Sequence, residues 1–253
     1  MSALAGRVVL VTGAGQGLGR GIALACAERG AAVAVTALSE AEAAVVAAEI
    51  TGEGGRALAI GCDVTDQGQV TVAVAATMAA FGRLDGLVHN ANSRFSGVGA
   101  TLATVSDEAW DDQIAVGLHG ALFCATAALP GLRDSGGAMV IMSSLAGLNG
   151  APHMPAYAMV KGAQRGLMKS LAREWGPLGV RVNAVAPSGV TPALEAYMER
   201  TPGAREHLSS RSALNRLGEA RDDIGAAVAF LLGSDSRFIT GQTLVIDGGA
   251  VTT

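Results

Sequence analysis

The sequence of 253 residues contains few aromatic residues, few cysteines and no long apolar run. Its three cysteines, Cys26, Cys62 and Cys124, lie far apart and form no C-x-x-C pair, which argues against a disulfide framework and against a zinc site. We therefore predict no metal site, and we expect the cysteines to be small buried side chains in a reducing compartment.

Basic clusters and signal segments are also missing. The 18 basic and 22 acidic residues are scattered along the chain and give a net charge of -4, so neither a nucleic-acid partner nor a membrane surface is expected. No 18 consecutive residues are apolar, and MSALAGR leads straight into VVLV without the apolar core of a signal peptide. These features predict a cytoplasmic protein.

The chain instead alternates short apolar runs with longer helical stretches. The runs predict strands at 8–11, 32–36, 57–60, 86–89, 138–142, 181–185 and 243–246, and helices are expected at 17–29, 40–50, 66–81, 107–130, 156–176 and 221–233. Continuous apolarity is typical of strands buried on both faces, and the helices supply the crossovers that parallel strands require. We predict one α/β domain over 1–253, with a doubly wound, Rossmann-like, seven-stranded parallel sheet.

The segment 187–217 is the exception, because it has three prolines and poor periodicity. It is expected to be a substrate loop or lid, whose apolar lining would come from Leu194, Tyr197, Met198, His207 and Leu208. An ordinary amphipathic surface helix is the alternative.

A glycine-rich string, Thr12 to Gly19, follows the first predicted strand and leads into a predicted helix. A dinucleotide pyrophosphate binds at such a helix N-terminus, where free N–H groups and the helix dipole favour anions. A structural turn would also use glycines, so the strand-to-helix context carries this prediction.

The end of the second strand normally reads the cofactor ribose, through an acidic side chain for a 2′-hydroxyl or a basic one for a 2′-phosphate. Here Ala37-Leu38-Ser39 offers neither. The missing carboxylate slightly favours NADP(H) over NAD(H), with Thr36 and Ser39 as hydrogen-bonding groups.

Three residues form a candidate catalytic set. Ser144 ends the fifth strand, and Tyr157 and Lys161 are four residues apart on one face of the next helix. An adjacent ammonium is expected to lower the phenol's pKa of about 10, so that Tyr157 exchanges a proton with a substrate oxygen while Ser144 donates a second hydrogen bond. A Tyr/Lys pair alone is usually only packing, but the pair coincides here with the serine and the dinucleotide loop.

The sequence resembles the short-chain dehydrogenase/reductase family over nearly its whole length. The motifs that match are TGAGQGLG, CDV, HNAN, Ser144 with Tyr157-x-x-x-Lys161, RVNAVAP and ITGQTLVIDGG, and TALSE is similar to members that reduce 3-oxoacyl thioesters. The resemblance implies an NAD(P)(H)-dependent oxidoreductase that acts on a ketone or secondary alcohol and assembles as a homotetramer or homodimer.

The resemblance also implies cofactor contacts. Asp63 would contact the adenine, Asn90 would lie by the adenosine ribose, Lys161 would bind the nicotinamide ribose, and Val190 and Thr191 would approach the carboxamide. The full cofactor set is Gly13, Gln16, Gly17, Leu18, Gly19, Asp63, Val64, Asn90, Tyr157, Lys161, Pro187, Val190 and Thr191. Taken singly, Asp63 could equally be a turn or cap residue and Asn90 a loop residue. His153 occupies a position that faces substrate in the family.

The sequence departs from the family at several positions. Gly117 stands where the family has an asparagine that helps to hold a proton-relay water, His89 and Asn92 replace the outer residues of NNAG, and Val160 replaces a small polar residue. Gly117 and the altered NNAG motivate an alternative function, a cofactor-binding but catalytically weak or silent member with a structural or regulatory role.

Overall fold

The computed structural model describes residues 3–252 and forms one seven-stranded sheet. The strands are β1 Val8–Val11, β2 Ala32–Ala37, β3 Arg56–Gly61, β4 Gly86–His89, β5 Ala138–Met142, β6 Arg181–Pro187 and β7 Thr243–Ile246. Their order is β3-β2-β1-β4-β5-β6-β7, and every neighbouring pair is parallel. The predicted doubly wound sheet is confirmed, and its strand order reverses direction between β1 and β4.

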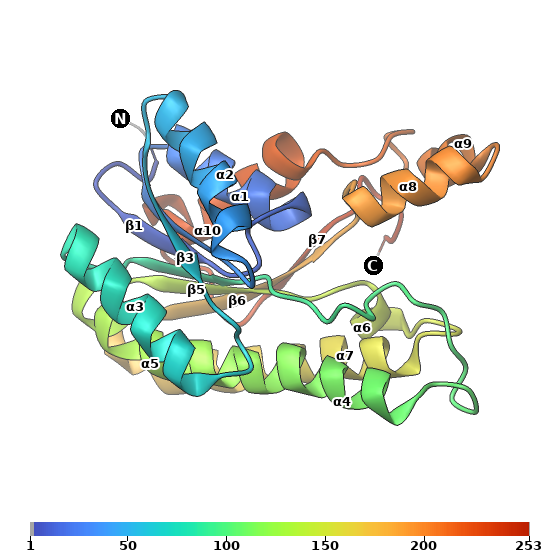
Figure 1. The fold of residues 1–253 in the computed structure, drawn as a ribbon, viewed down its shortest axis with the longest axis horizontal. Helices are drawn as coiled ribbons and strands as arrows, with labels where there is room; N and C mark the ends of the chain where they lie inside the picture. The colour runs from blue at the N-terminus through green and yellow to red at the C-terminus, as the bar shows by residue number, and fades with distance from the viewer. Residues whose placement is uncertain (1–2, 253) are drawn as a thin grey trace.

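Helices cover both faces of the sheet (Figure 1). They are α1 Gly17–Glu28, α2 Glu40–Gly52, α3 Gln67–Phe81, α4 Asp107–Ile114, α5 Gly120–Ser135, α6 Ala146–Asn149, α7 Pro155–Trp175, α8 Pro192–Arg200, α9 Ala204–Ser210 and α10 Ala226–Leu232. Short π-helical turns span Ala115–His119 and Ala220–Gly225, and 3₁₀ turns span Gly176–Leu178 and Ser234–Ser236. α1, α2 and α10 lie on one side, whereas α3, α5 and α7 lie on the other.

The apolar strands contribute side chains to two separate hydrophobic cores, one on each face of the sheet. Along β1, Val9 and Val11 belong to the core beneath α1 and α10, whereas Leu10 belongs to the core beneath α3, α5 and α7. Because alternate side chains of a strand point to opposite faces, a strand buried on both faces needs apolar residues at every position. This requirement explains the continuous runs in the sequence.

The helix expected at 107–130 differs from the prediction in two ways. It continues past Pro130 to Ser135 and ends at Gly136, whose φ of 59° is a left-handed conformation that suits glycine. It is also interrupted by the π turn at Ala115–His119, which contains Gly117. The span Asp107–Ser135 is long and apolar enough to cross a membrane by length and composition, but its parts pack on α3, β4 and α7 within the domain.

The segment expected to be irregular carries two helices, α8 and α9. Thr191 starts α8 by accepting a hydrogen bond from the Leu194 backbone N–H, and Pro192 occupies the first helical position, which needs no donor. α8 and α9 extend beyond the carboxyl edge of the sheet, above α6 and α7 in the view of Figure 1. This placement puts them next to the site described below.

Candidate functional site

Two adjoining cavities open at the carboxyl ends of the strands, where the strand order reverses. One has a volume of about 310 Å³ and lies against the glycine loop; the other has about 810 Å³ and extends to the end of β5 and to α8. Both are lined by Leu18, Asn90, Asn92 and Thr191. In open α/β sheets, this crevice is the usual place for a ligand.

The glycine loop borders the smaller cavity. Four residues of the predicted cofactor set, Gly13, Gln16, Leu18 and Gly19, line it, and Gly17 lies between them with a left-handed φ of 58°. Gln16 makes no side-chain cap and the first turn of α1 contains no acidic residue, so the first N–H groups of this helix remain available to an anion. These features fit a dinucleotide pyrophosphate.

The glycines also have a packing role, which the sequence did not reveal. A Cβ at Gly13 would lie 2.8 Å from the Ala91 Cα, and one at Gly19 would lie 2.9 Å from the Ala14 Cα. Asn90 holds this tight arrangement, since its amide nitrogen donates to the Thr12 carbonyl at 3.0 Å and to the Gly13 carbonyl at 2.9 Å. Asn90 therefore lines both cavities and fastens the loop to the end of β4.

Ser144, Tyr157 and Lys161 meet at the larger cavity. Ser144 and Tyr157 line it, whereas Lys161 is only 2% exposed and lies beneath Tyr157, its Nζ 5.6 Å from the ring centre. Lys161 Nζ donates to the Met142 carbonyl at 2.6 Å, and the Ser143 hydroxyl donates to the Lys161 carbonyl at 2.9 Å. These bonds fasten α7 to the end of β5 and bring the predicted catalytic set together.

The electrostatics of this set differ from the prediction. Burial lowers the pKa of the Lys161 ammonium to about 7, and burial raises the pKa of the Tyr157 phenol. The Ser144 hydroxyl opposes the rise in the pKa of Tyr157 by hydrogen bonding. An ammonium with a pKa of about 7 carries only part of its charge at neutral pH, so the expected lowering of the phenol's pKa is not found here.

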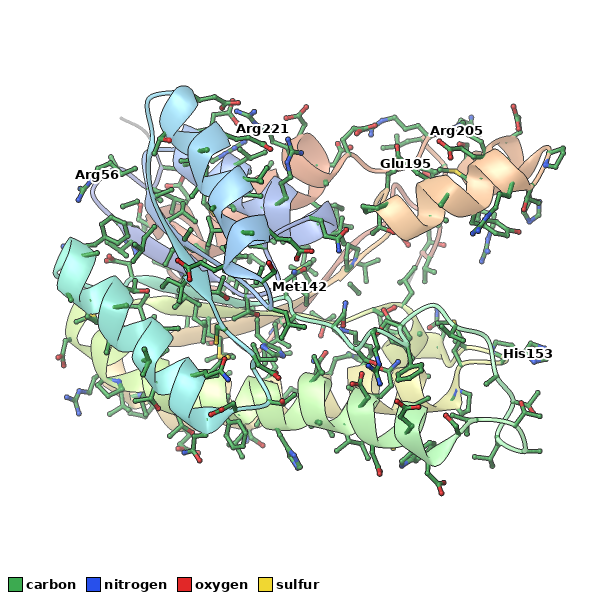
Figure 2. The ribbon with its side chains drawn as sticks, in the orientation of Figure 1. Arg56, Met142, His153, Glu195, Arg205 and Arg221 are labelled. Atoms are coloured by element: carbon green, nitrogen blue, oxygen red, sulfur yellow. The ribbon has the colours of Figure 1, made fainter. Side chains whose placement is uncertain are left out.

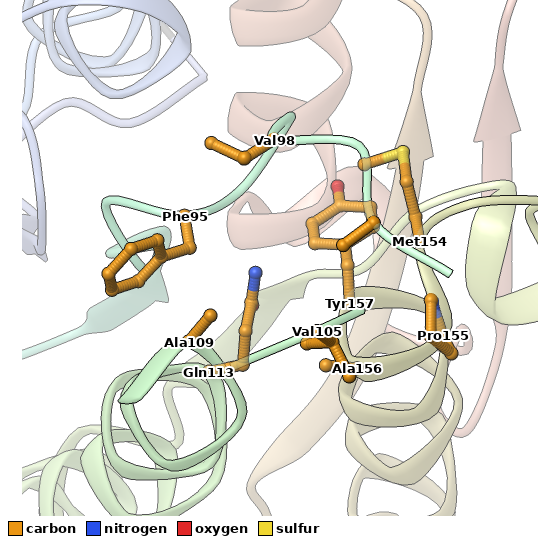
Figure 3. A pocket seen from close by; sticks show the side chains of 10 residues that line it. Phe95, Val98, Val105, Ala109, Gln113, Met154, Pro155, Ala156 and Tyr157 are labelled. Atoms are coloured by element: carbon orange, nitrogen blue, oxygen red, sulfur yellow. The ribbon is translucent and has the colours of Figure 1, made fainter. Parts of the chain in front are cut away.

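An apolar wall completes the surroundings of the phenol. A small pocket of about 40 Å³ lies beside Tyr157 and is lined by Phe95, Val98, Ala100, Val105, Ala109, Gln113, Met154, Pro155 and Ala156. Figure 3 shows the Tyr157 ring between Met154 and the loop that carries Val98, with the Gln113 amide directed toward the space between Phe95 and Tyr157. A partly apolar substrate group would fit against this wall.

The other predicted cofactor residues divide into two groups. Pro187 and Thr191 line the larger cavity. The second group lines neither cavity and consists of Asp63, Val64 and Val190. The Asp63 carboxylate accepts hydrogen bonds from the backbone N–H and the hydroxyl of Thr65. Val64 packs against Gly120, and the Val190 N–H donates to the Gly218 carbonyl. Asp63 thus makes the hydrogen bonds of a turn residue, and its contact with the adenine stays a prediction.

His153 is also displaced from the expected position. It is exposed, with a left-handed φ of 62°, and lies at the outer edge of the molecule, away from Met142 at the end of β5 (Figure 2). Its carbonyl accepts from the Ala100 N–H at 2.7 Å. The turn directs the ring outward, so His153 lines neither cavity.

Several residues that sequence reasoning missed line the cavities. Glu42, from the first turn of α2, lies beside the glycine loop: a Cβ at Gly15 would be 3.3 Å from its Oε2. Arg94 and Ser96 follow β4, and Arg200 ends α8. Glu42 lies five residues beyond the end of β2, and this spacing does not indicate a place at the cofactor cavity unless the turn into α2 is known.

Comparisons with known proteins agree with this geometry. A family model described as enoyl-(acyl carrier protein) reductase matches residues 13–251. The chain is 38% identical over 247 residues to the short-chain reductase protein NovJ of Streptomyces niveus, covering 96% of this chain and 93% of that one. It is 36% identical to a 2,5-dichloro-2,5-cyclohexadiene-1,4-diol dehydrogenase of Sphingobium indicum, covering 98% of both.

Further relatives point the same way. A 3-oxoacyl-[acyl-carrier-protein] reductase FabG of Staphylococcus aureus is 38% identical, with 95% of this chain and 96% of that one covered. A solved structure from Sinorhizobium meliloti, assigned as a short-chain alcohol dehydrogenase, is 35% identical with a TM-score of 0.89, covering 98% and 97% of the two chains. The chain therefore belongs to the short-chain dehydrogenase/reductase family and is an NAD(P)-dependent oxidoreductase.

Proposed function

We propose that this enzyme transfers hydride between NAD(P)(H) and a ketone or secondary alcohol, with Tyr157 as general acid and base. The observation that carries the proposal is the position of the Tyr157 phenol beside Ser144 in the wall of the 810 Å³ cavity, with Lys161 buried beneath it. A carbonyl oxygen placed there would receive hydrogen bonds from two hydroxyl groups.

Each residue of the set has a distinct role. A bound nicotinamide would accept or supply the hydride, and its oxidised ring would add positive charge near the phenol. During reduction, Tyr157 donates its proton to the oxygen that becomes the alcohol; during oxidation, the phenolate takes that proton back. Ser144 stabilises the negative charge that develops on this oxygen. Lys161 lies beneath the phenol, where the protonated fraction of its side chain supplies positive charge.

Glu42 bears on the preference between NADP(H) and NAD(H). The slight preference for NADP(H) rests on the missing carboxylate after β2, but the Glu42 carboxylate reaches the same cavity from α2. Among residues 3–252, no lysine or arginine lines this cavity. A 2′-phosphate would place negative charge beside Glu42, whereas a 2′-hydroxyl could donate to it. We therefore infer that NAD(H) is the preferred cofactor.

The larger cavity indicates the substrate class. Its lining includes Val98, Met154, Leu194 and Tyr197, which suits a modest-sized and partly apolar molecule. Leu194 and Tyr197 come from α8, so the segment 187–217 is proposed as the lid over this substrate. Met198 is 8% exposed and packs inward, and His207 is exposed.

The proposal extends to the assembly and the compartment. A homotetramer or homodimer would cover exposed apolar side chains on the helices, such as Leu122 on α5, which is 48% exposed. A cytoplasmic location fits the three buried and unpaired thiols. The alternative of a silent structural member is not favoured, because Ser144, Tyr157 and Lys161 lie together at the larger cavity.

Tyr157→Phe tests the proposal directly. We expect turnover of ketones and secondary alcohols to fall at least about a hundredfold, the usual loss of a general acid or base. NADH binding, followed by nicotinamide fluorescence, should be nearly unchanged. In the wild type, alcohol oxidation should increase with pH because the phenol must deprotonate, and ketone reduction should decrease over the same range.

A matched control is available, because the chain has only one other tyrosine, Tyr197. Tyr197→Phe should keep most of the turnover while it shifts KM. If Tyr157→Phe reduces ketones as fast as the wild type, Tyr157 is not the proton donor.

A further inference from the structure

A cluster of buried polar groups lies near Lys161, and its residues line neither cavity. His89, the last residue of β4, is fully buried, and its ring lies near enough to feel the charge of Lys161. Gln164 is also fully buried and follows Lys161 by three residues on α7, so the two share a helix face. Gly117, in the π turn, faces the same cluster through its carbonyl.

Part of the hydrogen-bonding capacity of this cluster is unused. Burial lowers the pKa of His89 to about 3, and the charge of Lys161 adds to this, so the ring is neutral and offers one donor and one acceptor. Neither ring nitrogen, nor the Gln164 Oε1, has a hydrogen-bond partner among residues 3–252. Buried polar groups of this kind are nearly always satisfied, and buried water is the usual partner where protein atoms are not.

The π turn shapes this cluster. Gln164 Nε2 donates to the Gly117 carbonyl at 2.9 Å, and the carbonyls of Val116 and Gly117 lie near enough to His89 to oppose the fall in its pKa. A Cβ at Gly117 would overlap the Val160 side chain. Val160 thus fills the space that a side chain at 117 would need, and the polar groups come from His89 and Gln164 instead.

We propose that His89 and Gln164 hold a buried water molecule against the Lys161 ammonium, and that they are positioning residues for proton exchange at Tyr157. The water accepts a hydrogen bond from Lys161 and donates one to the Gln164 Oε1, and His89 supplies the third contact. In this chain, His89 and Gln164 hold the water, because Gly117 has no side chain that could do so. The inference rests on the proposed role of Tyr157.

The proposal has a defined electrostatic consequence. Burial alone lowers the pKa of Lys161 to about 7. A water that accepts from Lys161 stabilises its charged form and holds the pKa above that value, so loss of the water would lower the pKa towards about 7. Less positive charge beneath Tyr157 would then raise the pKa of the phenol. The titratable groups packed around Lys161 are Tyr157 on α7 and His89 on β4; β5 contributes the Met142 carbonyl, and the π turn contributes backbone carbonyls.

The test compares His89→Leu, Gln164→Leu and the double variant with the wild type, in alcohol oxidation across the pH range. Each single change should lower kcat about tenfold, roughly the effect of losing one hydrogen bond. Each should also shift the pH of half-maximal rate upward and leave KM and NADH binding nearly unchanged. Because both residues hold one water, the double variant should lose little more than either single variant.

Two further variants separate this role from simple stability. His89→Asn keeps a donor and an acceptor and should recover much of the lost rate. Thr77→Val removes a different buried hydrogen bond, from the Thr77 hydroxyl to the Ala73 carbonyl within α3, and should lower the thermal midpoint without moving the pH profile. If His89→Leu does not fold, Gln164→Leu carries the test alone.

The expected result is the upward pH shift in both single variants, without additivity in the double variant. Unshifted pH profiles, or shifts that simply add, would overturn the proposal. If Tyr157→Phe is inactive and the pH profiles of the His89 and Gln164 variants are unshifted, the proposed function stands and only the water proposal falls. If Tyr157→Phe is active, both the proposed function and the water proposal lose their basis.

Discussion

At the scale of single residues, cofactor choice depends on Glu42. Glu42→Gln removes the charge that a 2′-phosphate would face, so NADPH should bind about tenfold more tightly, which corresponds to about 1.4 kcal/mol. NADH should bind more weakly or equally, because its 2′-hydroxyl loses a charged acceptor. The measurement is fluorescence titration of both cofactors at low and high salt, since salt screens a charge effect.

Glu40→Gln is the matched control for this prediction. Glu40 starts the same helix and carries the same charge, but it packs at Gly61 and is not among the residues that line the cofactor cavity. Its neutralisation should leave the ratio of the two dissociation constants unchanged. Equal effects of Glu40→Gln and Glu42→Gln would show that net charge, not contact at the ribose, decides the preference.

The predicted site residues that line the cavities include those placed by the strand ends. Ser144 and Asn90 follow β5 and β4, and parallel strands bring their carboxyl ends to one edge. Glu42 and Gln164 were not predicted, because their positions depend on how α2 turns away from β2 and on which face α7 buries. Predicting either position requires knowledge of how the helices pack, which the periodicity of the sequence does not give. His153 failed for a related reason, since a left-handed φ turned its side chain outward.

At the scale of elements, the π turn within the long helix depends on Gly117. Gly117→Ala should destabilise the protein by about 1–3 kcal/mol, the usual cost of overpacking, because the new Cβ would overlap Val160. Gly117→Asn should behave in the same way and should not increase activity. Urea unfolding followed by circular dichroism measures the change, and Val160→Ala should relieve it.

Gly166→Ala provides the control on a neighbouring helix. Gly166 lies within α7, and a Cβ there would have nothing within 4 Å, so alanine should stabilise the protein by roughly 1 kcal/mol through helix propensity. Opposite signs for the two glycine substitutions would establish that packing against Val160, not helix propensity, keeps residue 117 small. A stabilising Gly117→Ala would contradict the overlap.

At the scale of the whole molecule, the sheet separates two apolar layers that hold different cysteines. Cys26 lies in the core beneath α1, and Cys124 lies in the core beneath α5. The strands between them supply alternate residues to both layers. Removing one layer would expose one face of every strand, so the two cores are expected to unfold together.

Thiol labelling of proteins with a single cysteine, the others replaced by alanine, tests this cooperativity. Burial raises the pKa of both thiols to about 12, so neither should react with a disulfide reagent in the native state. In mild urea, labelling then requires unfolding, and Cys26 and Cys124 should react at equal rates that follow the global free energy of unfolding. Faster labelling of Cys124 would instead show that the layer containing α5 and α7 opens on its own. That opening would expose Lys161 and its polar cluster to water, and the buried water proposed there would exchange on the same timescale.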